Sequence, residues 1–177
     1  MTTFYLVRHG ETAYDVAERL RLKGHSRDLM PLTERGIAQV EARAAELRGI
    51  SFQVLLSSPM TRALQSAAIF SRHLDLPITV DFDLREWAPD LTFTYDTFAF
   101  VEAAGAECRR HGGEWPPGQT CSWEPLSVVR ERALSVLRRY LNCERVLVVC
   151  HGMVIGALVG QQLPIAGAGL CELQLVE

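Results

Sequence analysis

Short apolar runs alternate with longer amphipathic segments along the chain. Four runs have the length of buried strands: Phe4–Arg8, Val54–Ser57, Ile78–Phe82 and Val146–Cys150. Runs that lack polar alternation are typical of parallel strands covered on both faces. A fifth run, Glu172–Val176, alternates apolar and polar residues, which favours an edge strand. The pattern predicts a mainly parallel sheet.

In the segments between these runs, apolar residues recur at the spacing of one helix face. Thr33 is suited to cap a helix whose apolar face holds Ile37, Val40, Ala44 and Leu47. Ser58 is the predicted cap of a second helix, with Pro59 at its first position, and the apolar face holds Ala63, Ala67 and Phe70. Both segments are therefore predicted to be helices that pack on the sheet.

Two more helices are expected near the C-terminus. Residues Leu126–Leu141 repeat apolar side chains at Val129, Ala133, Leu137 and Tyr140. The segment Met153–Leu163 is apolar almost all round, which predicts a buried helix. Strands that alternate with helices indicate an α/β fold with helices on both faces of the sheet.

The segment from Pro89 to Cys121 does not follow this alternation. It is rich in aromatic and turn residues, and we expect a helix only near Phe98–Ala104. Ligands of open α/β sheets bind beyond the carboxyl ends of the strands, so an excursion placed there would form a lid. With 177 residues and no internal repeat, we expect a single domain, residues 1–177, with a lid-like excursion at about 89–121.

Composition excludes several classes of function. The net charge of −3 and the absence of a dense basic block argue against nucleic acid and membrane-surface partners. No run is long and apolar enough to cross a membrane, and the N-terminus does not resemble a signal peptide. The five cysteines form no Cys-x-x-Cys pair, which argues against zinc and predicts reduced thiols in the cytoplasm. A Cys108–Cys121 bridge is the minor alternative.

The most informative motif follows the first run, where Arg8 and His9 precede Gly10. A neutral imidazole can act as a nucleophile while its second nitrogen keeps a proton, and a carbonyl in the turn at Gly10 could accept that proton. The adjacent guanidinium would attract a phosphoryl group. The alternative is a structural histidine that a neighbouring group satisfies.

A second cation is expected at the start of the helix after the second run. Arg62 would lie beside free N–H groups of the first turn, where charge, dipole and donors all favour an anion. A solvated surface arginine is the alternative.

A third motif, His151-Gly152, repeats the His-Gly turn after the last parallel strand. We expect His151 to share a crevice with His9 and to bind phosphate oxygens, although a buried histidine that caps the next helix is also possible.

The fourth candidate is Glu86, just beyond the third run and beside Trp87. Phosphoryl transfer from an ester requires a proton for the departing oxygen, and a carboxylic acid with a raised pKa can supply it. Packing against an aromatic ring would raise that pKa by desolvation. An exposed glutamate paired with Arg85 is the alternative.

In this order the motifs resemble the histidine phosphatase superfamily, also called the phosphoglycerate mutase-like family, from Leu6 to about Leu158. The segments Arg8–Thr12, Ser57–Ala67 and Pro31–Gln39 carry the resemblance. It implies a three-layer α/β/α sandwich with one antiparallel edge strand and no metal or other cofactor. It also implies that His9 is phosphorylated, that Glu86 donates the proton, and that the phosphate pocket contains Arg8, Arg62 and His151.

Two positions depart from the family pattern. Asp15 stands where the family often has an asparagine that contacts phosphate, and a carboxylate there would repel the dianion unless it were protonated or turned away. Glu86 is followed by Trp87-Ala88-Pro89 rather than by the family's glycine-containing turn.

The sequence therefore predicts a phosphomonoester hydrolase that acts on a small molecule through a phosphohistidine. A phosphomutase would use the same residues, but the short chain favours hydrolysis. A non-catalytic protein that binds a phosphorylated ligand is the third reading, and Asp15 is its one hint. The identity of the substrate and the oligomeric state are not specified by these patterns.

Overall fold

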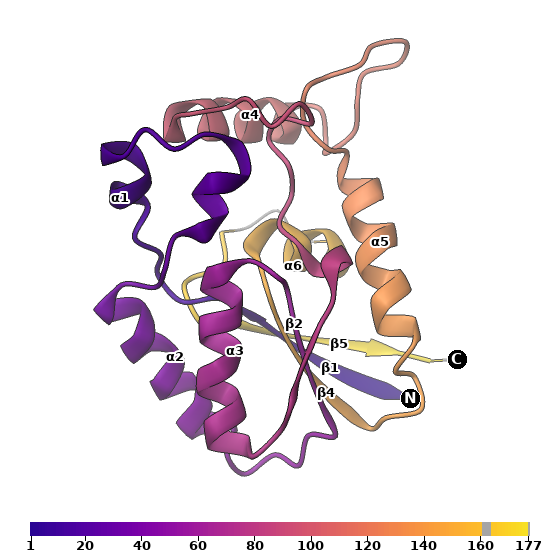
Figure 1. The fold of residues 1–177 in the computed structure, drawn as a ribbon. Helices are drawn as coiled ribbons and strands as arrows, with labels where there is room; N and C mark the ends of the chain where they lie inside the picture. The colour runs from indigo at the N-terminus through magenta and orange to yellow at the C-terminus, as the bar shows by residue number, and fades with distance from the viewer. Residues whose placement is uncertain (161–163, 177) are drawn as a thin grey trace.

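The protein is built around a five-stranded sheet with the order β3-β2-β4-β1-β5 (Figure 1). The computed structural model describes residues 1–160 and 164–176. The strands are β1 (Thr2–Arg8), β2 (Val54–Ser57), β3 (Ile78–Val80), β4 (Arg145–Cys150) and β5 (Leu170–Leu175). Strands β1 to β4 are parallel, whereas β5 pairs antiparallel with β1 at the edge. The predicted mainly parallel sheet with an antiparallel edge strand is confirmed.

Helices cover both faces of this sheet. On one face lie α2 (Glu34–Leu47) and α3 (Thr61–Leu74), and on the other lie α5 (Leu126–Arg138) and α6 (Gly152–Val159). Successive strand residues point to opposite faces. In β1, Leu6 accordingly belongs to the apolar cluster of α5 and α6, whereas Val7 belongs to that of α2 and α3. The three-layer α/β/α fold is confirmed.

A further group of segments lies at one end of the sheet, where Figure 1 shows α1 and α4 side by side. It contains α1 (Tyr14–Arg19), the 3-10 helix η1 (Gly24–Leu29) and α4 (Phe98–Arg110), which extends beyond the helix predicted at Phe98–Ala104. Gly24 N–H donates to the Tyr95 carbonyl at 2.8 Å, and Arg27 donates to the Asp96 carbonyl at 2.7 Å. These contacts join η1 to the loop that leads into α4.

The start of α3 differs from the prediction. Helix α3 begins at Thr61 and Met60 occupies the cap position, so the predicted cap at Ser58 with Pro59 as first helical residue is wrong. Ser58 N–H instead donates to the Val149 carbonyl at 3.0 Å, which continues the pairing of β2 with β4. The chain turns into a helix only after that pairing ends.

Other boundaries shift by a few residues. Phe82 lies in the 3-10 helix η2 (Phe82–Leu84) rather than in β3, and its side chain is exposed. Helix α5 ends at Arg138, before Tyr140. Helix α6 ends at Val159, and residues 161–163 of the predicted Met153–Leu163 helix lie outside the described residues. Ile37, expected on the apolar face of α2, is also exposed.

All five cysteines are free thiols, so Cys108 and Cys121 do not form a bridge. Within residues 1–160 and 164–176, none of the helices has both the length and the apolar character needed to cross a bilayer.

Candidate active site

Three parallel strands bring polar residues to the same edge of the sheet. The register pairs Arg8 with Cys150 in β1 and β4, and Ser57 with Val149 in β2 and β4. The next residues are therefore neighbours, and His9 N–H donates to the Cys150 carbonyl at 3.1 Å. The rings of His9 and His151 lie 5.1 Å apart between centroids. The two His-Gly turns therefore lie side by side, as the sequence predicted, and both rings are buried.

The hydrogen bonds of His9 define its tautomer. Its Nδ1 lies 2.7 Å from the Gly10 carbonyl, and Arg62 Nε donates to its Nε2 at 3.2 Å. A guanidinium can only donate, so Nε2 carries the lone pair and Nδ1 carries the proton. Burial, together with the charges of Arg62 and Arg8, holds the pKa of His9 well below its usual value. The ring is therefore neutral, and its Nε2 lone pair accepts from Arg62.

Two glycines let α2 approach the loop that carries His9. A Cβ on Gly10 would lie 2.3 Å from the Gly36 carbonyl oxygen, and one on Gly36 would lie 2.1 Å from that of Glu11. Both distances are shorter than any tolerated contact, so only glycine fits. Gly10 N–H also donates to Ser66 Oγ of α3 at 3.2 Å. The His9 loop is thus held between α2 and α3.

Arg62 is the second residue of α3 and is almost fully buried. Besides the bond to His9, its Nη1 pairs with Asp28 Oδ1 at 3.1 Å. The Tyr14 ring lies below the guanidinium, with its centroid 5.7 Å from Cζ. Burial raises the pKa of Tyr14, so the phenol is neutral. Phosphate oxygens at this position would compete with the Asp28 carboxylate for the guanidinium.

His151 is fully buried at the start of α6, and its ring does not cap that helix. Its Nε2 lies 2.7 Å from Ser58 Oγ. Burial and the charge of Arg62 lower the pKa of His151 well below its usual value, so this ring is also neutral. If the Ser58 hydroxyl donates to Nε2, Nδ1 carries a proton, and it has no partner among the described residues. Arg8 Nε is a second buried donor without a partner there.

Glu86 is half-buried and lies on the loop after η2. Burial raises the pKa of its carboxyl, against the lowering effect of the Trp87 backbone N–H, which donates to Oε1 at 2.9 Å, and of the charges of Arg62 and Arg8. Trp87 is buried, as the desolvation argument requires. This environment shifts the carboxyl toward its protonated form relative to a glutamate in water.

A pocket of about 370 Å³ contains Arg8, Arg62 and Glu86 in its wall. His9 and His151 do not line it, whereas Arg62, which donates to His9 Nε2, does. The wall also has an apolar part, Trp87, Phe93, Tyr95, Phe98, Val101 and Met153, and a charged part that includes Arg27, Asp28, Arg85, Glu102 and Arg109. Phe93 and Phe98 are substantially exposed. Most of these residues belong to the segment 89–121 that the sequence predicted to be a lid-like excursion.

Of the five candidate residues, Arg8, Arg62 and Glu86 line this pocket, while His9 contacts Arg62 and His151 lies next to His9. Asp15 is not part of this group, because it is exposed on α1 and does not line the pocket. Sequence reasoning missed Asp28 and Ser58. Asp28 had no signal in the sequence, since it lies in a segment without periodicity, whereas Ser58 was assigned to a helix cap.

The fold and this site define an α/β/α protein with two neighbouring buried histidines and two arginines at the carboxyl ends of its parallel strands. The model of the histidine phosphatase superfamily (branch 1) matches residues 4–175, and the chain belongs to this superfamily. An uncharacterized phosphatase, PhoE of Bacillus subtilis (strain 168), is 27% identical over 163 residues, which cover 90% of this chain and 76% of PhoE. A probable phosphoglycerate mutase, GpmB of Enterobacter sp. (strain 638), is 32% identical over 168 residues, with coverage of 90% and 74%.

Solved structures show the same fold. The native structure of a mycobacterial glucosyl-3-phosphoglycerate phosphatase superposes with a TM-score of 0.74 at 23% identity. The superposition covers 97% of this chain and 89% of that one. The superfamily and the phosphatase relative together indicate phosphatase activity.

Proposed function

We propose that this protein hydrolyses phosphomonoesters through a phosphohistidine on His9. The observation that carries the proposal is the tautomer of His9, whose Nε2 lone pair is directed at the Arg62 guanidinium while Nδ1 is bonded to the Gly10 carbonyl. This arrangement holds the nucleophile neutral beside a permanent positive charge, which attack on a phosphoryl dianion requires.

The reaction has two steps. In the first, a bond forms between His9 Nε2 and phosphorus while the ester P–O bond breaks, and Glu86 gives its proton to the leaving oxygen. In the second, water attacks phosphorus, the P–N bond breaks, and Glu86 takes the proton of the water. Arg8, Arg62 and His151 bind the equatorial oxygens and offset their charge.

No metal ion is needed in this scheme, because two guanidinium groups and the N–H of His151 supply the charge stabilisation that metals provide in many other phosphoryl-transfer enzymes. We therefore expect a chelator to leave the rate of phosphate release unchanged. A loss of activity that Mg²⁺ or Zn²⁺ restores would contradict this part of the proposal.

The apolar part of the pocket wall favours a phosphatase over a phosphoglycerate mutase. A small, strongly anionic phosphoglycerate would leave Phe93, Phe98 and Val101 without contacts, whereas a leaving group with an apolar or ring portion would bury them. We propose that the substrate is such a phosphomonoester. The non-catalytic alternative loses its one hint, since Asp15 does not face the pocket.

The test uses the purified full chain with a panel of phosphomonoesters that ranges from phosphoglycerates to aryl phosphates. We expect steady release of phosphate without a bisphosphate primer. Acid-labile, base-stable phosphoprotein should accumulate on mixing and be absent in His9→Asn, whereas His111→Asn, which changes an exposed histidine, should keep it. Isomer formation that depends on the primer would indicate a mutase instead, and inactivity across the panel would support a binding protein.

A further inference from the structure

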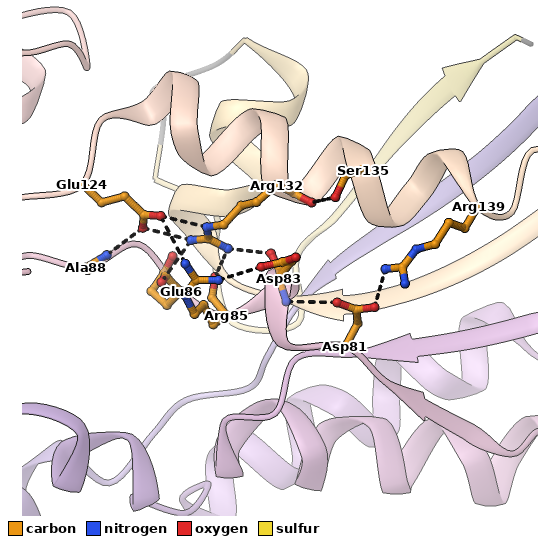
Figure 2. Close-up of polar contacts among 9 residues, drawn as sticks. All are labelled: Asp81, Asp83, Arg85, Glu86, Ala88, Glu124, Arg132, Ser135 and Arg139. Atoms are coloured by element: carbon orange, nitrogen blue, oxygen red, sulfur yellow. Dashed lines mark hydrogen bonds and ion pairs between the residues drawn. The ribbon is translucent and has the colours of Figure 1, made fainter.

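The loop that carries Glu86 is held by a buried arginine of α5. Arg132 is only 9% exposed, and Figure 2 shows its guanidinium directed at the backbone of this loop. It donates to three backbone carbonyls of this loop, those of Asp83 at 2.6 Å, Arg85 at 2.8 Å and Glu86 at 3.3 Å. The backbone on the amino side of the Glu86 carboxyl is therefore tied to α5.

A buried carboxylate holds the other side of the loop. Glu124 is 4% exposed and accepts from Arg132 twice, at 2.9 Å from Nε and at 3.0 Å from Nη2. Its Oε2 also accepts the Ala88 N–H at 3.2 Å, and its backbone carbonyl accepts Trp87 Nε1–H at 2.6 Å. Figure 2 shows Glu124 between the guanidinium and Ala88.

Together the two side chains fix the backbone immediately before and after Glu86. Burying two charges is costly, and an apolar pair of the same size would often be as stable, so stability alone does not explain the pair. Proton transfer, by contrast, depends steeply on where the carboxyl lies, because a misplacement of about 1 Å can cost about a hundredfold in rate. A rigid loop is what the proton donor requires.

We propose that Arg132 and Glu124 are positioning residues that hold the Glu86 carboxyl at the leaving oxygen. This inference rests on the proposed function, in which Glu86 donates the proton. Neither residue touches the substrate. Both act on the first step by fixing the loop from residue 85 to residue 88.

The leaving group separates this role from a merely structural one. An alkyl phosphate must be protonated as its P–O bond breaks, whereas a 2,4-dinitrophenyl phosphate leaves as a stable anion and gains little from an acid. We therefore compare kcat/KM, which reports transfer to His9, for the two substrates in one sample of each variant. The ratio of the two values is independent of the folded fraction.

For Arg132→Met and Arg132→Lys, we expect the alkyl-to-dinitrophenyl ratio to fall by about tenfold or more, toward the loss seen when general acid catalysis is removed. Lysine keeps a charge but cannot reach three carbonyls and a carboxylate at once. Glu124→Gln, which preserves the size of the side chain and removes its charge, tests the second residue of the pair, and we expect the same fall in the ratio. Arg138→Met is the matched control, since Arg138 lies on the same helix but pairs with Glu131 at the surface.

The Glu86→Gln variant separates failure of this inference from failure of the proposed function. If Glu86→Gln leaves the ratio unchanged, Glu86 is not the acid and the proposed mechanism is wrong. If Glu86→Gln lowers the ratio but the Arg132 and Glu124 variants keep it, the inference alone is overturned. Support requires in addition that Arg132→Met lowers the ratio no further in the Glu86→Gln background.

Discussion

Arg62 contacts both His9, the proposed nucleophile, and the carboxylate of Asp28. Its Nε donates to His9, and its Nη1 pairs with Asp28. Replacement by lysine keeps the charge but removes the planar donor set that reaches His9 and phosphate together. Loss of charged hydrogen bonds worth about 1.5–3 kcal/mol lowers a rate by about 10- to 100-fold. We expect Arg62→Lys to lower kcat/KM by this factor in steady-state assays.

The control for this prediction is Arg72→Lys, because Arg72 lies on the same helix but is exposed and pairs with Glu41. It should keep wild-type kcat/KM. Equal losses in the two variants would show that α3 is perturbed as a whole and that the geometry of Arg62 has no special role.

Two buried neutral histidines also make stability depend on pH. Burial holds the pKa of His9 and of His151 well below 6.5, the value of the unfolded chain. At a pH between the pKa of these histidines in the folded chain and that in the unfolded chain, only the unfolded chain is protonated at them. The stability from this source is therefore complete above about pH 6.5 and is lost as the pH falls toward the folded pKa.

We expect the free energy of unfolding to decrease from pH 6 to pH 5, and His151→Gln to reduce that decrease by about 1 kcal/mol per pH unit. Urea titrations at the two pH values measure it. The raised pKa of Glu86 changes the free energy of unfolding with pH in the opposite direction. Because Glu86 is present in both the wild type and His151→Gln, its contribution cancels when the two are compared. An unchanged slope in His151→Gln, equal to that of the exposed control His111→Gln, would contradict the prediction.

At the scale of single residues, the sequence predicted which strand ends bring candidate side chains together but not how these side chains are paired. His9 and His151 follow apolar strands, so strand register alone brings them together. The pairing of Arg62 with Asp28 arises from η1, a segment without hydrophobic periodicity. The buried Arg132 did leave a signal, because it interrupts the apolar stripe of α5 formed by Val129, Ala133, Val136 and Leu137.

At the scale of elements, the N-terminus of α2 supports the His9 loop. Thr33 Oγ1 accepts the Gly36 N–H at 2.9 Å and donates to Glu11 Oε1 at 2.9 Å, so one hydroxyl caps the helix and holds the loop. The cap that the sequence predicted here is confirmed, whereas the one at Ser58 is wrong. Thr33 lies directly before α2, whereas Ser58 still belongs to the pairing of β2 with β4, two residues before the cap position of α3.

We expect Thr33→Ala to lower the free energy of unfolding by about 1 kcal/mol, the usual loss for a helix cap, as measured by urea denaturation. Thr33→Ser keeps the hydroxyl and should remain within about 0.5 kcal/mol of the wild type. Because Thr33 also holds Glu11, the alanine variant should lower kcat as well. Wild-type stability in Thr33→Ala would show that the cap contributes nothing.

At the scale of the whole molecule, apolar periodicity was enough to predict the layers, because both sheet faces and all four packing helices are defined by their apolar residues. It did not predict how the segments at residues 13–30 and 89–121 meet. That arrangement depends on contacts between distant polar groups, such as Gly24 with Tyr95 and Arg27 with Asp96. Such pairs have no periodic signature.

The site joins elements from across the molecule, since Arg8 ends β1, Arg62 begins α3 and His151 precedes α6. An anion bound to all three connects these elements in the folded state only. Inorganic phosphate at about 100 times its Kd should therefore add about 2.7 kcal/mol of stability. For a chain of this size, Tm should rise by about 5–10 °C in calorimetry at constant ionic strength.

Arg8→Met should lose most of this rise, because it removes one of the buried donors that face the anion. Arg145→Met is the control, since Arg145 lies at the amino end of β4, away from the carboxyl ends of the strands where the site is built. It should keep the full rise, as chloride at equal ionic strength should produce none. Equal rises in both variants would mean that phosphate acts through general ion effects, and the cationic pocket would then have no measurable affinity for the group it is proposed to hold.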